Sequence, residues 1–473
     1  MWLNGGVAGN TPSVEELLDR IARLEGELAR RDRELAAKDQ RIAELERIIE
    51  ELGRRGKRQA APFSKGTPSL DPKRPGRKPG EGYGHQALPK RPRRVDDTVR
   101  VGCPLWCRHC HGRVRLHGTG HQYVLDLPEV RPHVTEFVVD YGYCEECGRR
   151  VQGRHPRQVS DVLEVGTVHL GPGVISFAAY LNKVGGLSYG KTVAVIERMS
   201  GLRLSRSTCC RVLLRLARKA APSYGGLVES VRASPVVYPD ETGWRIGGWP
   251  AWLWAYVTPR ATVYAIERGR GYAEASAILG KDYSGVIGAD GWGAYRRFQQ
   301  AQHQTCLAHL LRRCREMIEV SWGAGLCFPR RVSTLLHDAL DLRDRYVCGE
   351  VSRHGARVAR GFLRRRLDAL LEPNFRSGSN RRLAAHLRRN RDALFLFVDR
   401  KNVEATNWPA EQAIRPAVVN RKVWGGNRTV AGARAQAILM SIFRTCQQQM
   451  LDPFLVFARM LRSPVARPQS LTH

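Results

Sequence analysis

The sequence predicts a multidomain α+β protein, and three observations lead to that fold class. A heptad pattern near the N-terminus is typical of a coiled coil. Two Cys-x-x-Cys pairs follow in a span of strand-like composition, and beyond them short apolar strands alternate with amphipathic helices. With 473 residues, the chain is long enough for two or more domains and a sizeable core.

The charge balance indicates a polyanionic partner. Lys and Arg number 77 against 45 Asp and Glu, so the formal net charge is +32. Nucleic acid is the simplest such partner, because cations that neutralise phosphates release counterions; a basic assembly protein, such as a ribosomal one, is the alternative. The N-terminus lacks a secretory pattern, and no apolar run approaches the ~18 residues of a membrane span. We therefore expect a cytoplasmic location with no membrane partner.

A coiled coil is predicted within residues 1–53. Residues 13–52 contain no proline and only Gly26 as a weak helix former. One seam of the heptad consists of Val14, Ile21, Leu28, Leu35, Ile42 and Ile49. The other consists of Leu17, Leu24, Leu45 and Leu52, interrupted by Arg31 and Lys38. We expect this helix to mediate homo-oligomerisation; packing against its own chain is the alternative.

Residues 54–98 are rich in Lys, Arg, Pro and Gly and predict a disordered basic linker. Its stretch "KRPGRKPG" has the composition of a basic arm that lies along a DNA minor groove. A solvated tether explains the same composition, and the sequence does not decide between the two.

A structural zinc site is predicted in a β-rich module at 99–155. The segments "CPLWCRHCHG" and "YGYCEECGRR" each contain a Cys-x-x-Cys pair, and four thiolates suit tetrahedral Zn²⁺. The expected ligands are Cys107, Cys110, Cys144 and Cys147. Cys103 could replace Cys107, and His109 and His111 lie near enough to compete. Because the set leaves no open position beside a general base, we assign it no catalysis.

A helical DNA-binding region is predicted at 156–225. A helix, a turn at Gly201 and a second helix capped by Ser205 or Ser207 resemble a helix-turn-helix. The residues expected to meet phosphates or base edges are Arg206, Arg211 and Arg215. A plain helical bundle has the same pattern.

Two apolar strands each deliver an acid at their end. The segment "VVYPDETGW" reaches Asp240, and "YSGVIGADGWGAY" reaches Asp290. Between them, "WPAWLWAYVTPR" and "ATVYAIERGR" predict antiparallel strands beside the first. Both carboxylates should then lie at one edge of the sheet.

A third acid opens a helix in "NVEATNWPAEQAIRP". Asn407 or Thr406 is expected to cap the helix, Pro409 fits its first turn, and Glu411 follows. Three carboxylates can share one site only with cations, and two Mg²⁺ ions (or Mn²⁺) ~3.5–4 Å apart would supply them. The prediction is a two-metal phosphoryl-transfer site formed by Asp240, Asp290 and Glu411.

Each acid also has a structural interpretation. Asp is frequent in turns at strand ends, and an acid in a first helical turn complements the helix dipole. Glu241 and Glu404 are rival acids, although Glu241 should point to the opposite face of its strand from Asp240. The combination of the three acids in a strongly basic chain favours catalysis.

Four segments resemble the transposases of the insertion-sequence-sixty-six family (TnpC type), and the resemblance runs from the coiled coil to about residue 450. They are "DET" at 240–242, "ADGWGAY" at 289–295, "CLAHLLRR" at 306–313 and "TNWPAEQAIRP" at 406–416. Trp408 and Gln412 depart from the family's third motif, which puts local DNA contacts in question more than the acid itself.

The resemblance implies a ribonuclease-H-like α/β core at 226–318 and 399–455, divided by a helical insertion at 319–398, with a tail at 456–473. It implies a DDE-type transposase that cleaves transposon ends and joins them to target DNA, with Asp240, Asp290 and Glu411 as catalytic metal ligands. Accessory proteins of the same element and a bacterial, nucleoid-associated location are further implications.

Several cations accompany the third acid. Arg415, Arg421 and Lys422 follow it and are candidates for neutralising DNA phosphates, with helix-surface charge as the alternative. His309 is a candidate phosphate contact, although a lone histidine is more often structural. Two other functions remain open: a non-catalytic zinc-containing DNA-binding regulator, and a ribonuclease-H-like nuclease that cuts without joining.

Overall fold

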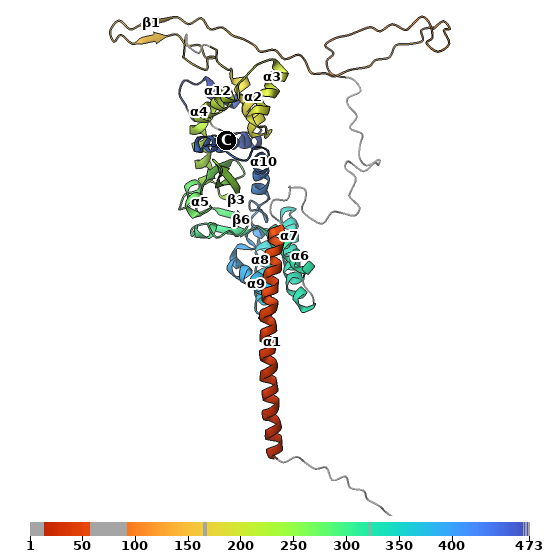
Figure 1. The fold of residues 1–473 in the computed structure, drawn as a ribbon, viewed down its shortest axis with the longest axis vertical. Coiled ribbons are helices and arrows are strands. Elements are labelled where there is room, and N and C mark those ends of the chain that lie inside the picture. Colours follow the sequence, from red (N-terminus) through yellow and green to blue (C-terminus); the bar gives the residue numbers. More distant parts are fainter. Residues whose placement is uncertain are drawn as a thin grey trace, which may run out of the picture. The chain divides into compact units, whose positions relative to one another are not determined.

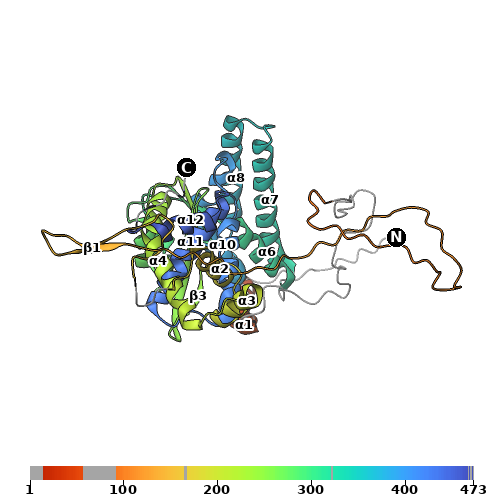
Figure 2. The ribbon, with the colours of Figure 1, turned by 90° about the horizontal axis from the view of Figure 1, so that it is seen from above.

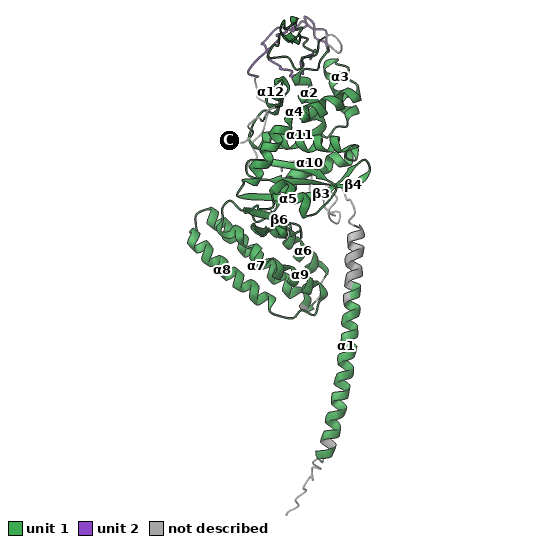
Figure 3. Ribbon diagram, turned by 90° about the vertical axis from the view of Figure 1, so that its left-hand side faces the viewer, with its two compact units in different colours: residues 1–52, 132–473 green, residues 53–131 purple. Residues whose placement is uncertain are grey.

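The computed structural model describes residues 14–56, 92–163, 168–320, 323–466, 468 and 471 (Figure 1). The chain divides into two compact units, one of residues 1–52 with 132–473 and one of residues 53–131, coloured green and purple in Figure 3. Within the described residues, no helix has the length and apolar character needed to cross a membrane. Most of the predicted linker lies outside the described residues.

The heptad region forms one continuous helix, α1 (Val14–Gly56). The prediction of a helix here is confirmed. Its apolar seam is open: the exposed fractions of Ile21, Leu28, Leu35 and Ile42 are 51%, 62%, 58% and 52%. Pairing of this seam with a partner stays a prediction.

The span between the Cys-x-x-Cys pairs contains less sheet than predicted. Among the described residues of 99–155, the only strands are β1 (Tyr141–Tyr143) and β2 (Arg150–Gln152), which pair as an antiparallel hairpin. The expected strands around Leu125 and Val134 are not formed, and these side chains are 74% and 85% exposed. Strand-like composition forms sheet only where a neighbouring strand can accept its hydrogen bonds.

A mixed five-stranded sheet forms the centre of the larger unit. Its strands are β3 (Val236–Ile246), β4 (Trp249–Val257), β5 (Thr262–Glu267), β6 (Val286–Ala289) and β7 (Gln302–Thr305). Their order is β5-β4-β3-β6-β7, with β3, β4 and β5 antiparallel and β3, β6 and β7 parallel. The predicted antiparallel hairpin beside the first strand, β4 and β5, is confirmed.

The sequence predicts that strand β3 ends at its acids, but in the structure it does not. It continues past Asp240 to Ile246, where a two-residue turn of Gly247 and Gly248 leads into β4. Both glycines have positive φ, 60° and 86°, which side chains with a Cβ rarely adopt. The pairing of β3 with its parallel neighbour β6, in contrast, stops before Asp240.

Helices cover both faces of the sheet. One face, with Val236 and Tyr238, packs against α10 (Trp408–Trp424) and the helices that follow β7. The other, with Val237 and Trp254, shares a core with α2, α4, α11 and α12. These helices span Pro172–Lys183, Arg206–Arg232, Val430–Gln448 and Pro453–Arg462. The alternation along β3 thus sends successive residues into different cores.

The helices between β7 and α10 are α6 (Leu307–Val320), α7 (Cys327–Val347), α8 (Arg353–Leu371) and α9 (Gly378–Arg389). Helices α7 and α8 run side by side (Figure 2). Leu335 and Leu336 of α7 and Leu363 and Leu367 of α8 are buried in the same core as one sheet face. The helices α7 to α9 occupy the stretch 319–398 in which a helical insertion was predicted.

The predicted helix-turn-helix consists of α3 (Tyr189–Ser200) and α4. Gly201 adopts φ 70° after α3, and the Ser205 hydroxyl accepts a hydrogen bond of 3.0 Å from Thr208 N, so Ser205 rather than Ser207 caps α4. Helix α4 has 27 residues and crosses the predicted boundary at residue 225. Because its buried face packs with the sheet, this region shares its core with the sheet domain.

Candidate active site

Asp240 lies in β3, and Asp290 directly follows the neighbouring parallel strand β6. Strands β3 and β6 pair Val236 with Val286 and Val237 with Ile287, so each acid lies four residues beyond the first pair. Asp290 directly follows β6, as predicted. Its carboxylate accepts a hydrogen bond of 2.9 Å from Trp292 N, which fixes the start of the following loop.

Glu411 lies in the first turn of α10, as predicted, but the cap of that helix differs from expectation. Asn407 is the N-cap residue, yet its side chain donates to Pro239 O at 2.8 Å instead of capping the helix. Its backbone N donates to Cys306 Sγ at 3.2 Å. These contacts tie the entry of α10 to the residue before Asp240 and to the end of β7.

The three acids interact electrostatically. Burial, followed by the negative charges of Glu241, Asp290 and Glu411, raises the pKa of Asp240 to about 7 against one opposing backbone hydrogen bond. A carboxyl group with such a pKa is held in an environment that disfavours its charge. A site that collects acids in this way favours the binding of cations.

Glu241 has a structural role that the sequence did not reveal. Its side chain is 3% exposed and forms an ion pair of 2.8 Å with Arg270. Tyr295 donates its hydroxyl to the other carboxylate oxygen at 2.8 Å. The rival acid Glu404 is exposed, and its backbone N donates to Tyr238 Oη at 2.7 Å. Glu241 is nonetheless the negative charge that most raises the pKa of Asp240.

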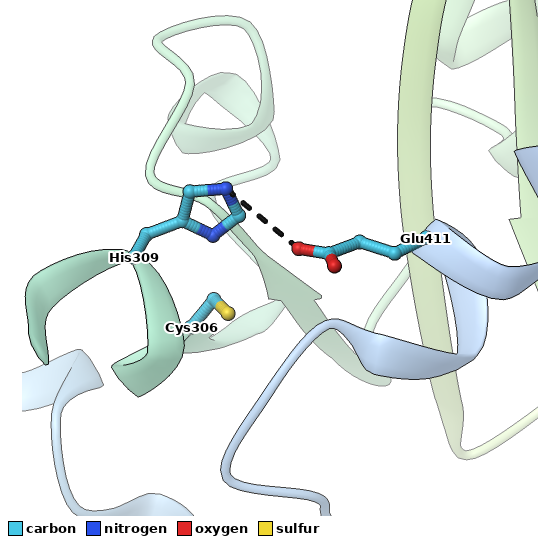
Figure 4. A group of neighbouring side chains, drawn as sticks. All are labelled: Cys306, His309 and Glu411. Carbon is cyan, nitrogen blue, oxygen red and sulfur yellow. Dashed lines mark ion pairs between the residues drawn. The ribbon is translucent and has the colours of Figure 1, made fainter. Parts of the chain in front are cut away.

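Cys306 and His309 complete the site beside Glu411 (Figure 4). His309 Nε2 lies 3.7 Å from Glu411 Oε1, and the Cys306 thiol lies near the other side of the imidazole. Polar contact with that thiol raises the pKa of His309 against the effect of burial, and the charges of Glu411 and Asp290 raise it further. Burial by itself would raise the pKa of Cys306, but contacts with His309 and Asn407 N outweigh it and lower the pKa.

The family comparison covers this whole site. A family model described as "Transposase IS66 family" matches residues 167–435, which is more than half of the chain. The chain belongs to the IS66 transposase family. It is also similar to the uncharacterised protein y4qI of Sinorhizobium fredii (strain NBRC 101917 / NGR234), with 24% identity over 317 residues. That similarity covers 59% of this chain and 57% of the length of y4qI.

The predicted DNA-binding cations fall into two groups in this IS66 family member. Arg206, Arg211, Arg415 and Lys422 are exposed. Arg421 and Arg215 are partly buried and donate to backbone carbonyls, Arg421 to Gly243 O and Arg215 to Val159 O. Burial also lowers the pKa of Arg421. One guanidinium nitrogen of each of these two arginines is thus engaged within the fold, and their contact with DNA stays a prediction.

The two Cys-x-x-Cys pairs adopt the same turn. Cys107 N donates to Gly112 O at 2.8 Å and His111 N to Cys107 O at 3.0 Å. In the second pair, Cys144 N donates to Arg149 O and Gly148 N to Cys144 O, both at 2.9 Å. His111 and Gly148, the fourth residue after each first cysteine, have φ of 56° and 66°.

Hydrogen bonds affect the titration of one thiol in each turn. Hydrogen bonds, chiefly from His109 N to Cys107 and from Cys147 N to Cys144, lower the pKa of both thiols. Lowering of the pKa favours the thiolate, the form that binds zinc. The first pair lies in the unit of residues 53–131 and the second in the larger unit, so a shared zinc ion stays a prediction.

Sequence reasoning missed one group beside the acids. The guanidinium of Arg270 lies over the rings of Trp252 and Trp292, at 4.5 Å and 4.0 Å from their centroids, and pairs with Glu241. Arg270 ends the segment "ATVYAIERGR", for which the sequence predicted only a strand. Spacing along the chain carries no signal for this group, because its members come from β4, the loop after β5 and the loop after β6.

Proposed function

We propose that the protein is a DNA transposase of the DDE type, with Asp240, Asp290 and Glu411 as its catalytic metal ligands. The observation that carries the proposal is the electrostatic coupling of these acids from three separate segments in a chain of the IS66 transposase family. We take the mixed sheet as the ribonuclease-H-like core that the sequence resemblance implies.

The donor set suits magnesium. Carboxylate oxygens are the ligands Mg²⁺ prefers, and nearby divalent charge would lower the raised pKa of Asp240. Two such ions would activate the attacking oxygen and stabilise the leaving oxygen of an in-line displacement. The chain's own part is to hold the carboxylates from β3, the end of β6 and the first turn of α10.

The reaction needs no nucleotide cofactor. Water first hydrolyses a phosphodiester at the transposon end and leaves a 3′-hydroxyl. That hydroxyl then attacks target DNA, and one phosphodiester replaces another. Exposed Arg415 and Lys422 on α10, and Arg206 and Arg211 on α4, would bind the DNA phosphates.

Two other parts of the chain would support this activity. Helix α1 would join copies of the chain through its exposed apolar seam. A structural Zn²⁺ held by the two Cys-x-x-Cys turns would stabilise the N-terminal module. Accessory proteins of the same element are further proposed partners.

The test is Asp290→Ala, assayed with labelled transposon-end DNA and a target plasmid in Mg²⁺. We expect loss of both cleavage and joining with end binding retained. The matched control is Asp282→Ala, an exposed acid on the loop before β6, which should leave all three unchanged. Absence of metal-dependent cleavage by the wild type with the element's own ends would favour the regulator; nicks without joined product would favour the nuclease.

A further inference from the structure

Three donor atoms of different chemistry converge beside the proposed magnesium site. Cys306 follows β7, His309 lies in the first turn of α6, and Glu411 lies in the first turn of α10 (Figure 4). The thiol sulfur, a ring nitrogen and a carboxylate oxygen lie within 4.8 Å of one another. Magnesium and its all-oxygen preference give no reason for a sulfur and a nitrogen here.

One donor separation fits a thiophilic cation. Tetrahedral zinc, with bonds of about 2.0–2.3 Å, separates a nitrogen from an oxygen ligand by about 3.4 Å. The observed separation of His309 Nε2 and Glu411 Oε1 is 3.7 Å. His309 and Glu411 are 37% and 36% exposed in their side chains, so an ion can enter from their side.

Two further observations show that the donor atoms are already held in place. His309 Nδ1 is buried with the Cys306 thiol as its polar contact, and both groups lie in the cluster with Glu411. Cys306 Sγ accepts the backbone amide of Asn407 at 3.2 Å, just as Cys107 Sγ accepts that of His109 at 3.4 Å in the first Cys-x-x-Cys turn. The sulfur of Cys306 is thus held in the same way as one in a predicted zinc turn.

We propose that Cys306, His309 and Glu411 form a regulatory site for a thiophilic divalent cation, Zn²⁺ in the first place, whose binding withdraws Glu411 from the magnesium site. The second half of this statement rests on the proposed function, because it assumes that Glu411 serves magnesium. Binding forms a metal–sulfur bond, and the thiol proton passes to solvent. The element would then stay silent where free zinc is high.

Selectivity follows from the donor atoms. Sulfur and imidazole nitrogen favour zinc or cobalt over magnesium, whereas the carboxylates of Asp240 and Asp290 favour magnesium. Since Glu411 belongs to both donor sets, the two ions compete for its carboxylate. Magnesium in excess should therefore displace the thiophilic ion, and zinc should block cleavage.

The test uses Co²⁺ as a spectroscopic probe, added without magnesium to the full-length protein purified with zinc. We expect a thiolate-to-cobalt charge-transfer band that Cys306→Ser removes, with cobalt affinity lowered at least about tenfold. The matched control is Cys348→Ser, which removes an exposed thiol at the end of α7 and should keep the band. His309→Ala should also weaken binding at least about tenfold, and thermal melts verify that each variant is folded.

A band of equal strength in wild type and Cys306→Ser, or no band in either, overturns the site. Competition tests the shared Glu411: Mg²⁺ should erase the band of the wild type, whereas Asp290→Asn should keep the band and need several-fold more Mg²⁺ to lose it. A wild-type band that saturating Mg²⁺ leaves unchanged overturns the withdrawal of Glu411. Neither readout requires DNA cleavage, so this failure is distinct from failure of the proposed transposase activity.

Discussion

Asp240 and Glu241 are neighbours on β3, and the two faces of that strand use a carboxylate in opposite ways. Asp240 pairs with Ala255 of β4 and faces the core of α10, beside Asp290 and Glu411. Its pKa is raised to about 7 by burial and by other acids. The largest of these charge effects comes from Glu241, its neighbour along the strand, and smaller ones come from Asp290 and Glu411.

On the opposite face, Glu241 pairs with Trp254, a member of the other core. Arg270 and Tyr295 bind its carboxylate, and two indole rings enclose the guanidinium. Here the negative charge has a cation and a hydroxyl as partners.

The comparison teaches that chemistry at this site depends on which face an acid occupies. A buried carboxylate with a cation beside it is stable as it stands. A carboxylate beside two others costs folding free energy until a metal ion binds, and such groups cluster at functional sites. Substitutions at the two carboxylates and around them test whether the two faces differ in this way.

The largest effect is expected from Asp240→Asn. Removing one of the proposed metal ligands should lower DNA cleavage by at least about 10³-fold, the scale of a lost strong electrostatic contact at a reaction centre. The same substitution should raise the free energy of unfolding at pH 7.5 when no magnesium is present, because a destabilising charge disappears. Cleavage assays and urea unfolding measure both.

The pH dependence of the free energy of unfolding should show that the charge of Asp240 destabilises the fold. The folded pKa of Asp240, about 7, lies above its ordinary value of 3.8, so its contribution to stability is full below pH ~4 and is lost as pH rises through 7. Between pH 4.5 and 7.5 this amounts to about 3–4 kcal/mol. The wild type minus Asp240→Asn difference in unfolding free energy should show this loss; identical pH profiles of the two proteins would contradict it.

The next largest effect is expected from Glu241→Gln. It leaves Arg270 without its anion between two indole rings, and breaking such a buried pair costs about 3 kcal/mol. Urea unfolding should show this loss at pH 7.5, opposite in sign to Asp240→Asn. Cleavage per folded molecule should fall far less than in Asp240→Asn.

The double variant Glu241→Gln with Arg270→Gln is the control for this pair. The double variant should lose less free energy of unfolding than the two single variants lose in sum, because each substitution removes the same interaction. Strict additivity would mean that the pair does not stabilise the fold.

The smallest effect is expected from Trp292→Ala. It removes one of the two rings that enclose Arg270 and should lower the free energy of unfolding by about 1 kcal/mol. Trp292→Phe keeps an aromatic face and should recover part of that loss. Equal stability of the Ala and Phe variants would show that the ring adds nothing to this contact.

Local patterns predicted most of the elements that position the acids. Alternating and apolar runs predicted β3 to β6, and Pro409 with the polar residues before it predicted the start of α10. The end of β3 was misjudged because the polar stretch after Pro239 resembles a strand end. The Gly247-Gly248 turn, a stronger hairpin signal, lies further on.

Contacts between distant segments were not predictable in the same way. Asn407 is a residue type that commonly caps helices, but its side-chain amide instead donates a hydrogen bond to Pro239 O. In the sequence, Arg421 looks like a surface cation of α10. In the structure α10 packs on β3, and Gly243 O of β3 accepts a hydrogen bond from Arg421. In each case the competing partner comes from a segment more than 160 residues away in the chain.

The sequence by itself determined the types of the elements, the basic charge and the three acids, because helix periodicity, strand alternation and turn residues depend on near neighbours. Only the tertiary structure decided which acid is neutralised, which is left beside other acids, and that a thiol and an imidazole meet Glu411. Those outcomes depend on which faces pack together, and burial changes the free energy of a charge far more than any local preference does.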